Sequence, residues 1–370
     1  MAETSDDSRF DSIRPYRDDE VPAAIARIMA NDSCVASIIN FQFRKIRFLS
    51  FFLKPLIRRY LKRKYGGLST VAEVQSCVAS FMDRMIASTT DGVVFEGFEN
   101  LDRNKGYLFI SNHRDIALDP AFVDLGLYRS GFNTVRIAIG DNLLRTQMAI
   151  DLMKLNQSFI VDRSSKGREL LNSLATLSDY IRLSIGENHS IWIAQREGRA
   201  KDGNDRTDPA ILKMFYLSGR KQKISFADYM KSLNIVPVAI SYEYDPGDAA
   251  KVHELYVKQT QGEYHKTKME DIDSIVKGIT GYKGRIHVRV GKPIEDGFST
   301  PEELSSIIDN FIHNNYFLFP SNYISAGETE KVSQEELKNF NERMNSIPEA
   351  ERDMFKAYYA NPVINSRSNS

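Results

Sequence analysis

From Gly92 onward, short strand-like runs alternate with longer intervals, and this alternation is the feature that most constrains the fold of this chain. From there on, short runs rich in β-branched and aromatic residues recur, as β-strands require. These runs are GVVFEGF, YLFIS, TVRIAIG, SFIVD, SIWIA, NIVPVAISYEY and RIHVRVG. Several intervals between them are long enough for a helix, for example residues 167–185. Strands that alternate with helices predict an α/β fold, with a mostly parallel central sheet flanked by helices.

The pattern changes on both sides of this region. Residues 1–20 are rich in Asp, Ser and Arg and predict a disordered tail. Residues 21–90 predict a basic amphipathic helical region, and residues 91–300 hold the sheet and the candidate chemistry. Residues 301–370 predict a C-terminal helical extension, whose last residues, NPVINSRSNS, are expected to be disordered.

Composition fits a globular protein and names no partner by charge. Of the 370 residues, 42% are hydrophobic and 26% are charged, with a formal net charge of zero. The two cysteines, Cys34 and Cys77, have no metal-binding spacing, and we find no secretory signal. Reduced thiols in a cytoplasmic protein are therefore expected.

The charge is unevenly distributed. Between Ser33 and Ala72 there are nine basic residues and no acidic one. Within residues 41–65, Pro55 is expected to kink or divide the helix. An apolar face recurs at helical spacing through Leu49, Phe52, Leu53, Leu56, Ile57 and Tyr60. This pattern predicts a helix in the membrane interface with its cations on anionic lipids, and the alternative is an amphipathic helix packed on the protein.

Two other roles of the basic segment, spanning a membrane and binding nucleic acid, are not expected. Its apolar runs fall short of the roughly 18 residues that a spanning helix needs, so we predict no transmembrane helix. Basic residues interleaved with aromatic ones can also bind nucleic acid. No sequence signature of a nucleic-acid-binding fold accompanies them, so we expect no nucleic-acid partner.

The stretch 107–120, YLFISNHRDIALDP, carries the candidate chemistry. An apolar run ends abruptly in polar residues, which predicts a buried strand that presents His113 at its end. Asp115 and Asp119 follow closely. An imidazole can accept a proton from an alcohol while a carboxylate orients it, so the cluster indicates general-base catalysis. The alternative is a capping and turn arrangement without catalytic function.

Five segments occur in an order typical of one family: VVFEGFENL, SNHRDIALDP, SFIVDRSSKG, QREGRAKDG and IVPVAISYE. In them the chain resembles the glycerolipid acyltransferases, the family of lysophosphatidate and glycerol-3-phosphate acyltransferases. The first two segments look like the lead-in and the catalytic histidine block, and the other three like the second, third and fourth blocks. The resemblance covers about residues 92–295.

The chain departs from the family pattern in two places. The family has its aspartate five positions after the histidine, where this chain has Leu118, and the aspartate follows at 119. The third block reads Glu197, Gly198, Arg199, one residue shorter than the usual Glu-Gly-x-Arg. We favour Asp119 as the partner of the histidine, with Asp115 as the alternative.

The resemblance implies a role for each matched residue. His113 would be the general base and Asp119 its partner, while the cationic side chains would bind the acceptor's phosphate. The implied substrate-binding residues are Arg163, Arg199, Glu197 and Gly198, with Lys166 and Lys213 as helpers. It implies no metal and no cofactor, only acyl-CoA or acyl-carrier protein as co-substrate.

The expected function is that of a peripheral membrane O-acyltransferase of phospholipid biosynthesis, on the cytoplasmic, inner face of the membrane. It would transfer a fatty acyl group to a lysophospholipid hydroxyl, with 1-acylglycerol 3-phosphate favoured as the acceptor and phosphatidate as the product. The alternatives are acylation of glycerol 3-phosphate or another lipid hydroxyl, and a non-catalytic lipid-binding relative.

Overall fold

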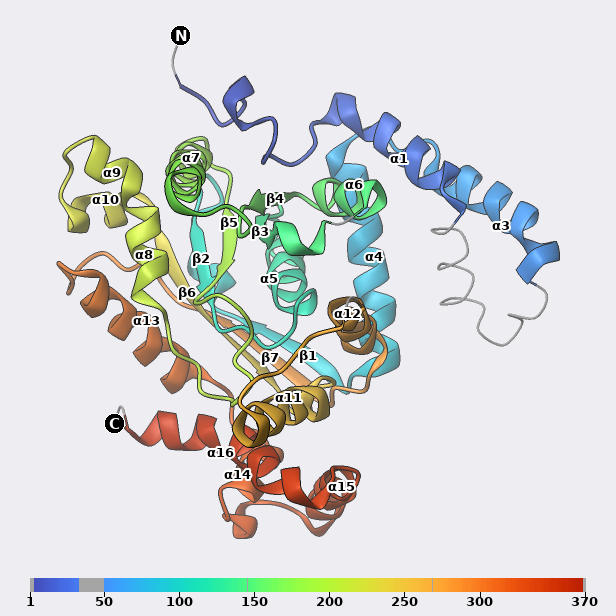
Figure 1. Cartoon of the computed structure of the whole chain (residues 1–370), viewed down its shortest axis with the longest axis vertical. Helices are drawn as coiled ribbons and strands as arrows, with labels where there is room; N and C mark the ends of the chain where they lie inside the picture. Colours follow the sequence, from blue (N-terminus) through green and yellow to red (C-terminus); the bar gives the residue numbers. More distant parts are fainter. Residues whose placement is uncertain (1–2, 33–49, 145, 268, 369–370) are drawn as a thin grey trace. The chain divides into compact units, whose positions relative to one another are not determined.

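The computed structural model describes residues 3–32, 50–144, 146–267 and 269–368 (Figure 1). The chain forms two compact units. The first comprises Met1–Phe81 and Arg136–Ser173, and the second comprises Met82–Val135 and Leu174–Ser370. The residue ranges of two described helices, α4 (Val71–Thr89) and α7 (Gly167–Gly186), include residues of both units.

In the first unit, strands β3 (Arg136–Gly140) and β4 (Ser158–Val161) pair in parallel. Helix α1 packs against α6 around a cluster of buried aliphatic side chains that includes Ile25 and Leu155. The other elements of this unit are η1 (Ser8–Phe10), η2 (Asp18–Glu20), α1 (Val21–Ala30), α3 (Ser50–Tyr65), η5 (Asp141–Leu143) and α6 (Gln147–Leu155).

The N-terminal segment is ordered from residue 3, which differs from the predicted disordered tail. Phe10 is fully buried, and the Arg14 guanidinium donates to Asp11 at 2.7 Å and to Glu20 at 2.6 Å. Although the segment is rich in polar residues, one buried aromatic ring and a partly buried ion-pair cluster hold it in place.

Helix α3 carries the described part of the basic segment, and Pro55 lies within it without dividing it. The predicted apolar face is split. Ile57 is buried, whereas Leu56 and Tyr60 are 65% and 50% exposed. Residues 41–49 of the predicted membrane-contact segment lie outside the described residues. Contact with a membrane therefore stays a prediction.

Within its described residues, the second unit contains five strands in the spatial order β1-β7-β6-β2-β5. Strands β6 and β7 pair antiparallel, and the other three described pairs are parallel. Every residue of β2 and of β6 is buried, as expected for strands covered on both faces. The predicted α/β fold with a mostly parallel sheet is thereby confirmed. The strands are β1 (Gly92–Glu96), β2 (Leu108–Ser111), β5 (Ile191–Ala194), β6 (Ile235–Tyr242) and β7 (Arg285–Val290).

Helices cover the two faces of this sheet. Consecutive side chains of a strand point to opposite faces. Tyr242 of β6 lies against Phe122 of α5 (Leu118–Arg129), while Ser241 accepts a hydrogen bond from the Phe317 amide, just beyond α13 (Pro301–Asn315). The remaining elements are η4 (Phe98–Asn100), α8 (Pro209–Phe215), α9 (Leu217–Lys221), α10 (Phe226–Ser232), α11 (Asp248–Gln261), α12 (Glu270–Thr280), α14 (Pro320–Ser325), η6 (Thr329–Lys331), α15 (Gln334–Asn345), η7 (Glu349–Glu351) and α16 (Arg352–Ser368).

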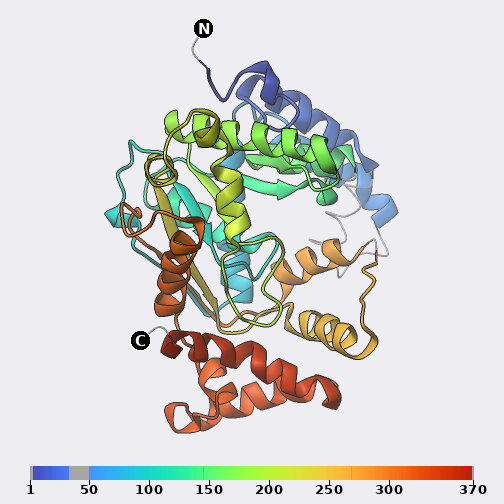
Figure 2. The same cartoon turned by 60° about the vertical axis from the view of Figure 1, so that its left-hand side comes forward.

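The last three α-helices, α14 to α16, pack on one another (Figure 2). Helix α16 continues to Ser368, so residues 361–368 are helical rather than disordered as predicted. Val363 is 1% exposed, and its burial stabilises a helix that the polar tail sequence did not indicate. Across the described part of the chain, no helix combines the length and the apolar character needed to cross a membrane.

Candidate active site

His113 lies just beyond the carboxyl end of β2, whose parallel neighbours are β5 and β6. Ligands of open α/β sheets bind at this edge. Asn112 fixes the chain there: its side-chain oxygen accepts from the Ile240 amide at 2.8 Å, and its side-chain nitrogen donates to the Ile240 carbonyl at 2.9 Å. The side chain thus continues the pairing to β6 after β2 has ended, which holds the following histidine in position.

The imidazole of His113 is oriented by Asp119. The distance from Nδ1 to the carboxylate Oδ2 is 2.9 Å, and the histidine side chain is 14% exposed while the aspartate is fully buried. The same Oδ2 accepts from the backbone amides of Arg114 at 2.5 Å and Asp115 at 2.9 Å. Oδ1 accepts from the Tyr242 hydroxyl at 2.7 Å. With Nδ1 engaged, Nε2 is the nitrogen that can meet a substrate hydroxyl.

The additional residue between His113 and Asp119 does not prevent their contact. A turn at residues 116–117 absorbs it, and Asp119 falls in the first turn of α5. The amides at a helix N-terminus favour a carboxylate in this place. The departure from the family spacing is therefore a change in loop length that keeps the pair together.

Asp115 has a different environment. Its Oδ1 accepts from the amides of Ala117 and Leu118, both at 2.9 Å, so it caps the start of α5. A Cβ on Gly278 would lie 2.2 Å from its Oδ2, so α12 approaches this carboxyl through a glycine. Burial, followed by the charge of Asp119, raises the pKa of Asp115 to about 6. Of the two candidate partners, Asp119 is the one that contacts the imidazole.

Two aromatic residues that the sequence reasoning missed complete the surroundings of the histidine. Trp192 of β5 meets the His113 ring edge-on at 5.8 Å between centroids, and its indole nitrogen donates to Ser111 Oγ at 3.0 Å. Burial, followed by the charge of Asp119, raises the pKa of Tyr242 well above its usual value, so its hydroxyl stays a donor. Tyr242 lies in the recognised fourth block, whereas no motif marked Trp192.

The third-block loop follows β5 and runs alongside the histidine. The Ala200 amide donates to the His113 carbonyl at 2.9 Å. The neighbouring Arg199 is partly buried, and its guanidinium donates to Ser274 of α12 at 2.6 Å. Gly198 has a φ of +75°, which favours glycine, and Glu197 is exposed. The structure thus brings the backbone of this loop to His113.

The other predicted substrate-binding residues are not brought to His113 by these contacts. Lys213 of α8 is 59% exposed and pairs with Glu302 at 2.8 Å. Arg163 and Lys166 are exposed and belong to the first unit. Their roles stay predictions. Within the described ranges, no group of three or more His, Cys, Asp or Glu side chains could hold a metal ion.

Residues 92–241 match the model of the family described as Acyltransferase. This segment includes His113, Asp119 and the third-block loop, so its similarity to that family agrees with the resemblance seen in the motifs.

Among solved structures, the 1-acyl-sn-glycerophosphate acyltransferase PlsC from Thermotoga maritima is similar to this chain, with 16% sequence identity and a TM-score of 0.37. The match covers 79% of this chain and 91% of that chain. Among curated proteins, none matches in sequence.

Proposed function

We propose that this chain is a peripheral membrane O-acyltransferase that acylates the free hydroxyl of a lysophospholipid, 1-acylglycerol 3-phosphate, to give phosphatidate. The observation that carries the proposal is the 2.9 Å contact between His113 and the buried Asp119 inside the matched acyltransferase domain. The donor is an acyl thioester, either acyl-CoA or acyl-carrier protein.

In this mechanism, Nε2 of His113 takes the proton from the acceptor hydroxyl as its oxygen attacks the thioester carbonyl. Asp119 stabilises the imidazolium that forms. The tetrahedral intermediate then expels the thiol, which leaves with the proton returned by the imidazolium. The products are an ester, a free thiol and the unchanged enzyme, so no acyl-enzyme is needed.

Among the cationic side chains of the second unit, we assign Arg199 to the acceptor's phosphate. Its neighbour Ala200 binds the His113 carbonyl, and its guanidinium is held by one hydrogen bond to Ser274. A guanidinium fixed in this way can bind two phosphate oxygens at once. The proposed membrane contact is supported by the exposed Leu56 and Tyr60 on a helix rich in basic residues.

The test is an acyl-transfer assay with purified wild type and His113→Ala. Acyl-CoA and acyl-carrier protein are each offered with 1-acylglycerol 3-phosphate, other lysophospholipids and glycerol 3-phosphate. We expect thiol release coupled to formation of phosphatidate, reduced by a factor of at least about 10² in the variant because the general base is lost. A different acylated acceptor would refute the assigned substrate. No transfer from either donor, with lipid binding intact, would establish a non-catalytic lipid-binding protein.

A further inference from the structure

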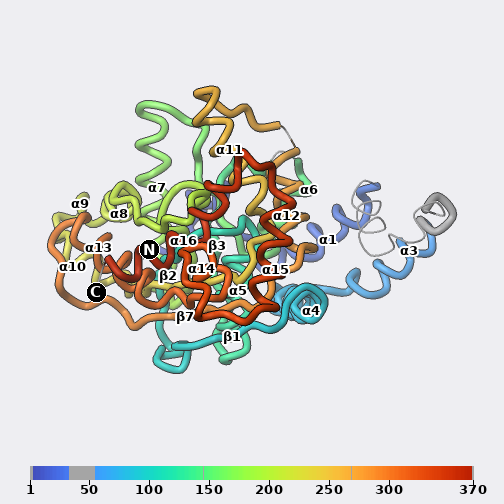
Figure 3. Tube along the Cα trace, turned by 90° about the horizontal axis from the view of Figure 1, so that it is seen from below, coloured from blue at the N-terminus to red at the C-terminus, as the bar shows by residue number. Residues whose placement is uncertain are grey.

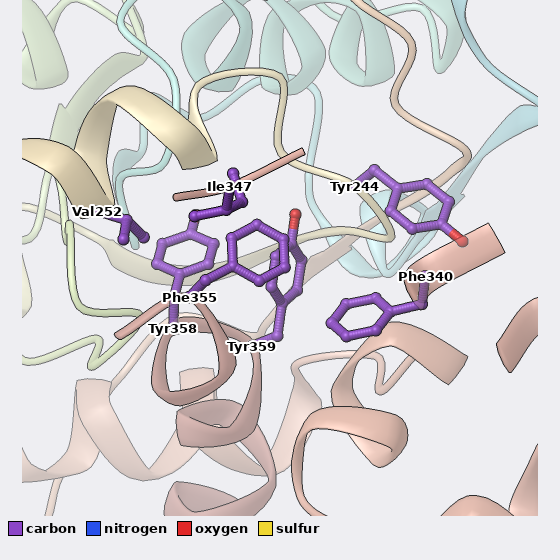
Figure 4. Close-up of a cluster of buried hydrophobic side chains, with 7 residues drawn as sticks. All are labelled: Tyr244, Val252, Phe340, Ile347, Phe355, Tyr358 and Tyr359. Carbon is purple, nitrogen blue, oxygen red and sulfur yellow. The ribbon is translucent and has the colours of Figure 1, made fainter. Parts of the chain in front are cut away.

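The C-terminal helices bring an aromatic cluster close to the histidine loop. Phe355, Tyr358 and Tyr359 of α16 pack with Val252 of α11 and Phe340 of α15 (Figure 4). Helix α16 also packs against α11, α13 and α14, and Figure 3 shows it beside α11. These elements lie beyond residue 241, where the family match ends.

Two buried ion pairs connect this cluster to the loop that carries His113. The first joins Arg114, the residue after the histidine, to Asp205 at 2.6 Å. The second joins Lys251 of α11 to Asp245. All four side chains are at most 5% exposed. Each cation is matched by an anion, which is the condition under which buried charges are tolerated.

Lys251 acts directly on the loop backbone. Its ammonium donates to the Arg114 carbonyl at 2.5 Å, while the Arg114 amide donates to Asp119 at the same distance of 2.5 Å. The backbone of this one residue is therefore held from both sides: by the carboxylate that orients His113 and by a buried cation of α11.

Tyr358 of α16 completes the arrangement. Its hydroxyl donates to Asp245 and lies 3.4 Å from the Lys251 ammonium. Its ring lies 5.1 Å from the Arg114 guanidinium carbon and 5.4 Å from the Lys251 nitrogen. Burial raises the pKa of Tyr358 well above its usual value, so the hydroxyl remains a donor. A Cβ on Gly203 would lie 2.0 Å from the Tyr358 carbonyl, so α16 approaches the loop after β5 through this glycine.

We infer that Tyr358 is a positioning residue of the active site, which acts through Asp245 and Lys251 to hold the Arg114 peptide and, with it, the pairing of His113 to Asp119. The inference rests on the proposed acyl transfer for its kinetic consequence. The C-terminal helices thereby contribute to catalysis, because the Tyr358 hydroxyl of α16 fixes Asp245, the carboxylate that pairs with Lys251.

The test compares two substitutions on the same helix, Tyr358→Phe and Tyr359→Phe. Both remove one buried hydroxyl and keep the ring. The Tyr359 hydroxyl bonds to Asp248 and to the Asp245 amide, so its loss perturbs the same region without a direct contact with Asp245's carboxylate or Lys251. Misplacement by about 1 Å can cost about 10²-fold in rate. Loss of the Tyr358 hydroxyl should displace the Arg114 peptide by less than this, so we expect Tyr358→Phe to lower kcat about tenfold with KM unchanged. We expect Tyr359→Phe to leave kcat near wild type.

A second measurement needs no substrate. The Nδ1 proton of His113 is hydrogen-bonded to Asp119, and its downfield NMR signal can be assigned by its loss in His113→Ala. We expect Tyr358→Phe to shift or broaden this signal and Tyr359→Phe to leave it unchanged. Equal effects of the two substitutions on kcat and on the signal, or no effect of either, would overturn the inference. If wild type transfers no acyl group, the proposed function fails, and the NMR comparison alone decides the positioning role.

Discussion

Replacing Asp119 by asparagine separates two contributions of this residue, its orientation of His113 and its negative charge. In the native site, Oδ2 accepts from the imidazole and also from the Arg114 and Asp115 amides. Both amides are fixed donors, so an asparagine must place its carbonyl oxygen in the Oδ2 position. Its amino group then faces the Tyr242 hydroxyl, which can rotate to accept.

This geometry predicts that Asp119→Asn keeps the Nδ1-protonated tautomer of His113, since the asparagine oxygen still accepts from Nδ1. The opposite flip would set the amino group against two backbone N–H groups, each of which would cost about 1–3 kcal/mol if left unpaired. What the variant loses is the charge that stabilises the imidazolium. At about 4 Å and an effective dielectric constant of about 20, this interaction is worth about 4 kcal/mol.

A loss of that size corresponds to a fall in kcat of about 10³-fold, because each 1.36 kcal/mol is about tenfold in rate. The assay is steady-state acyl transfer, combined with ¹⁵N NMR of the histidine side chains to identify the tautomer. Tyr242→Phe is the control, because it removes one hydrogen bond to the carboxylate and keeps the charge, for an expected loss of about tenfold in kcat. An Nε2-protonated His113 in Asp119→Asn would refute the argument from the backbone donors.

Two further predictions follow from other parts of the chain. Burial raises the pKa of Asp124 to about 7 from 3.8, so the folded state favours its protonated form and stability falls as pH rises from about 4 to 7. At about 1.36 kcal/mol per pKa unit, this shift lowers the free energy of unfolding by about 4 kcal/mol over that pH range. In urea unfolding, the stability of Asp124→Asn relative to wild type should therefore be a few kcal/mol greater at pH 8 than at pH 5. An equal difference at both pH values contradicts this. Replacing Arg59, Lys62 and Arg63 by Glu should weaken binding to anionic liposomes on the order of 10²-fold, at about 1 kcal/mol per basic residue. The charge-matched control replaces Arg220, Lys221 and Lys223 by Glu. Equal co-sedimentation of the two variants with the liposomes would exclude the α3 surface as the membrane contact.

The parts of the site that could be predicted from the sequence are those encoded locally. The apolar run before Ser111 indicated β2, and His113 with its two aspartates stood out within a few residues. These signals favoured Asp119 as the partner of His113 but left Asp115 open as the alternative. That choice depends on the turn at residues 116–117 and on two backbone amides that point toward Asp119. Trp192 could not be predicted at all, since its contact with His113 depends on the pairing of β5 with β2.

The same distinction explains why the C-terminal helices carried no functional signal in the sequence. The family match ends at residue 241, one position before Tyr242, whose hydroxyl binds Asp119. Lys251 and Tyr358 lie farther along the chain and reach the histidine loop only through the packing of α11 and α16. A motif can mark residues that meet substrate, because their types and spacing are fixed by chemistry. A buried lysine on a helix and a tyrosine near the end of the chain have no such spacing, so only the fold reveals that both hold the peptide next to His113.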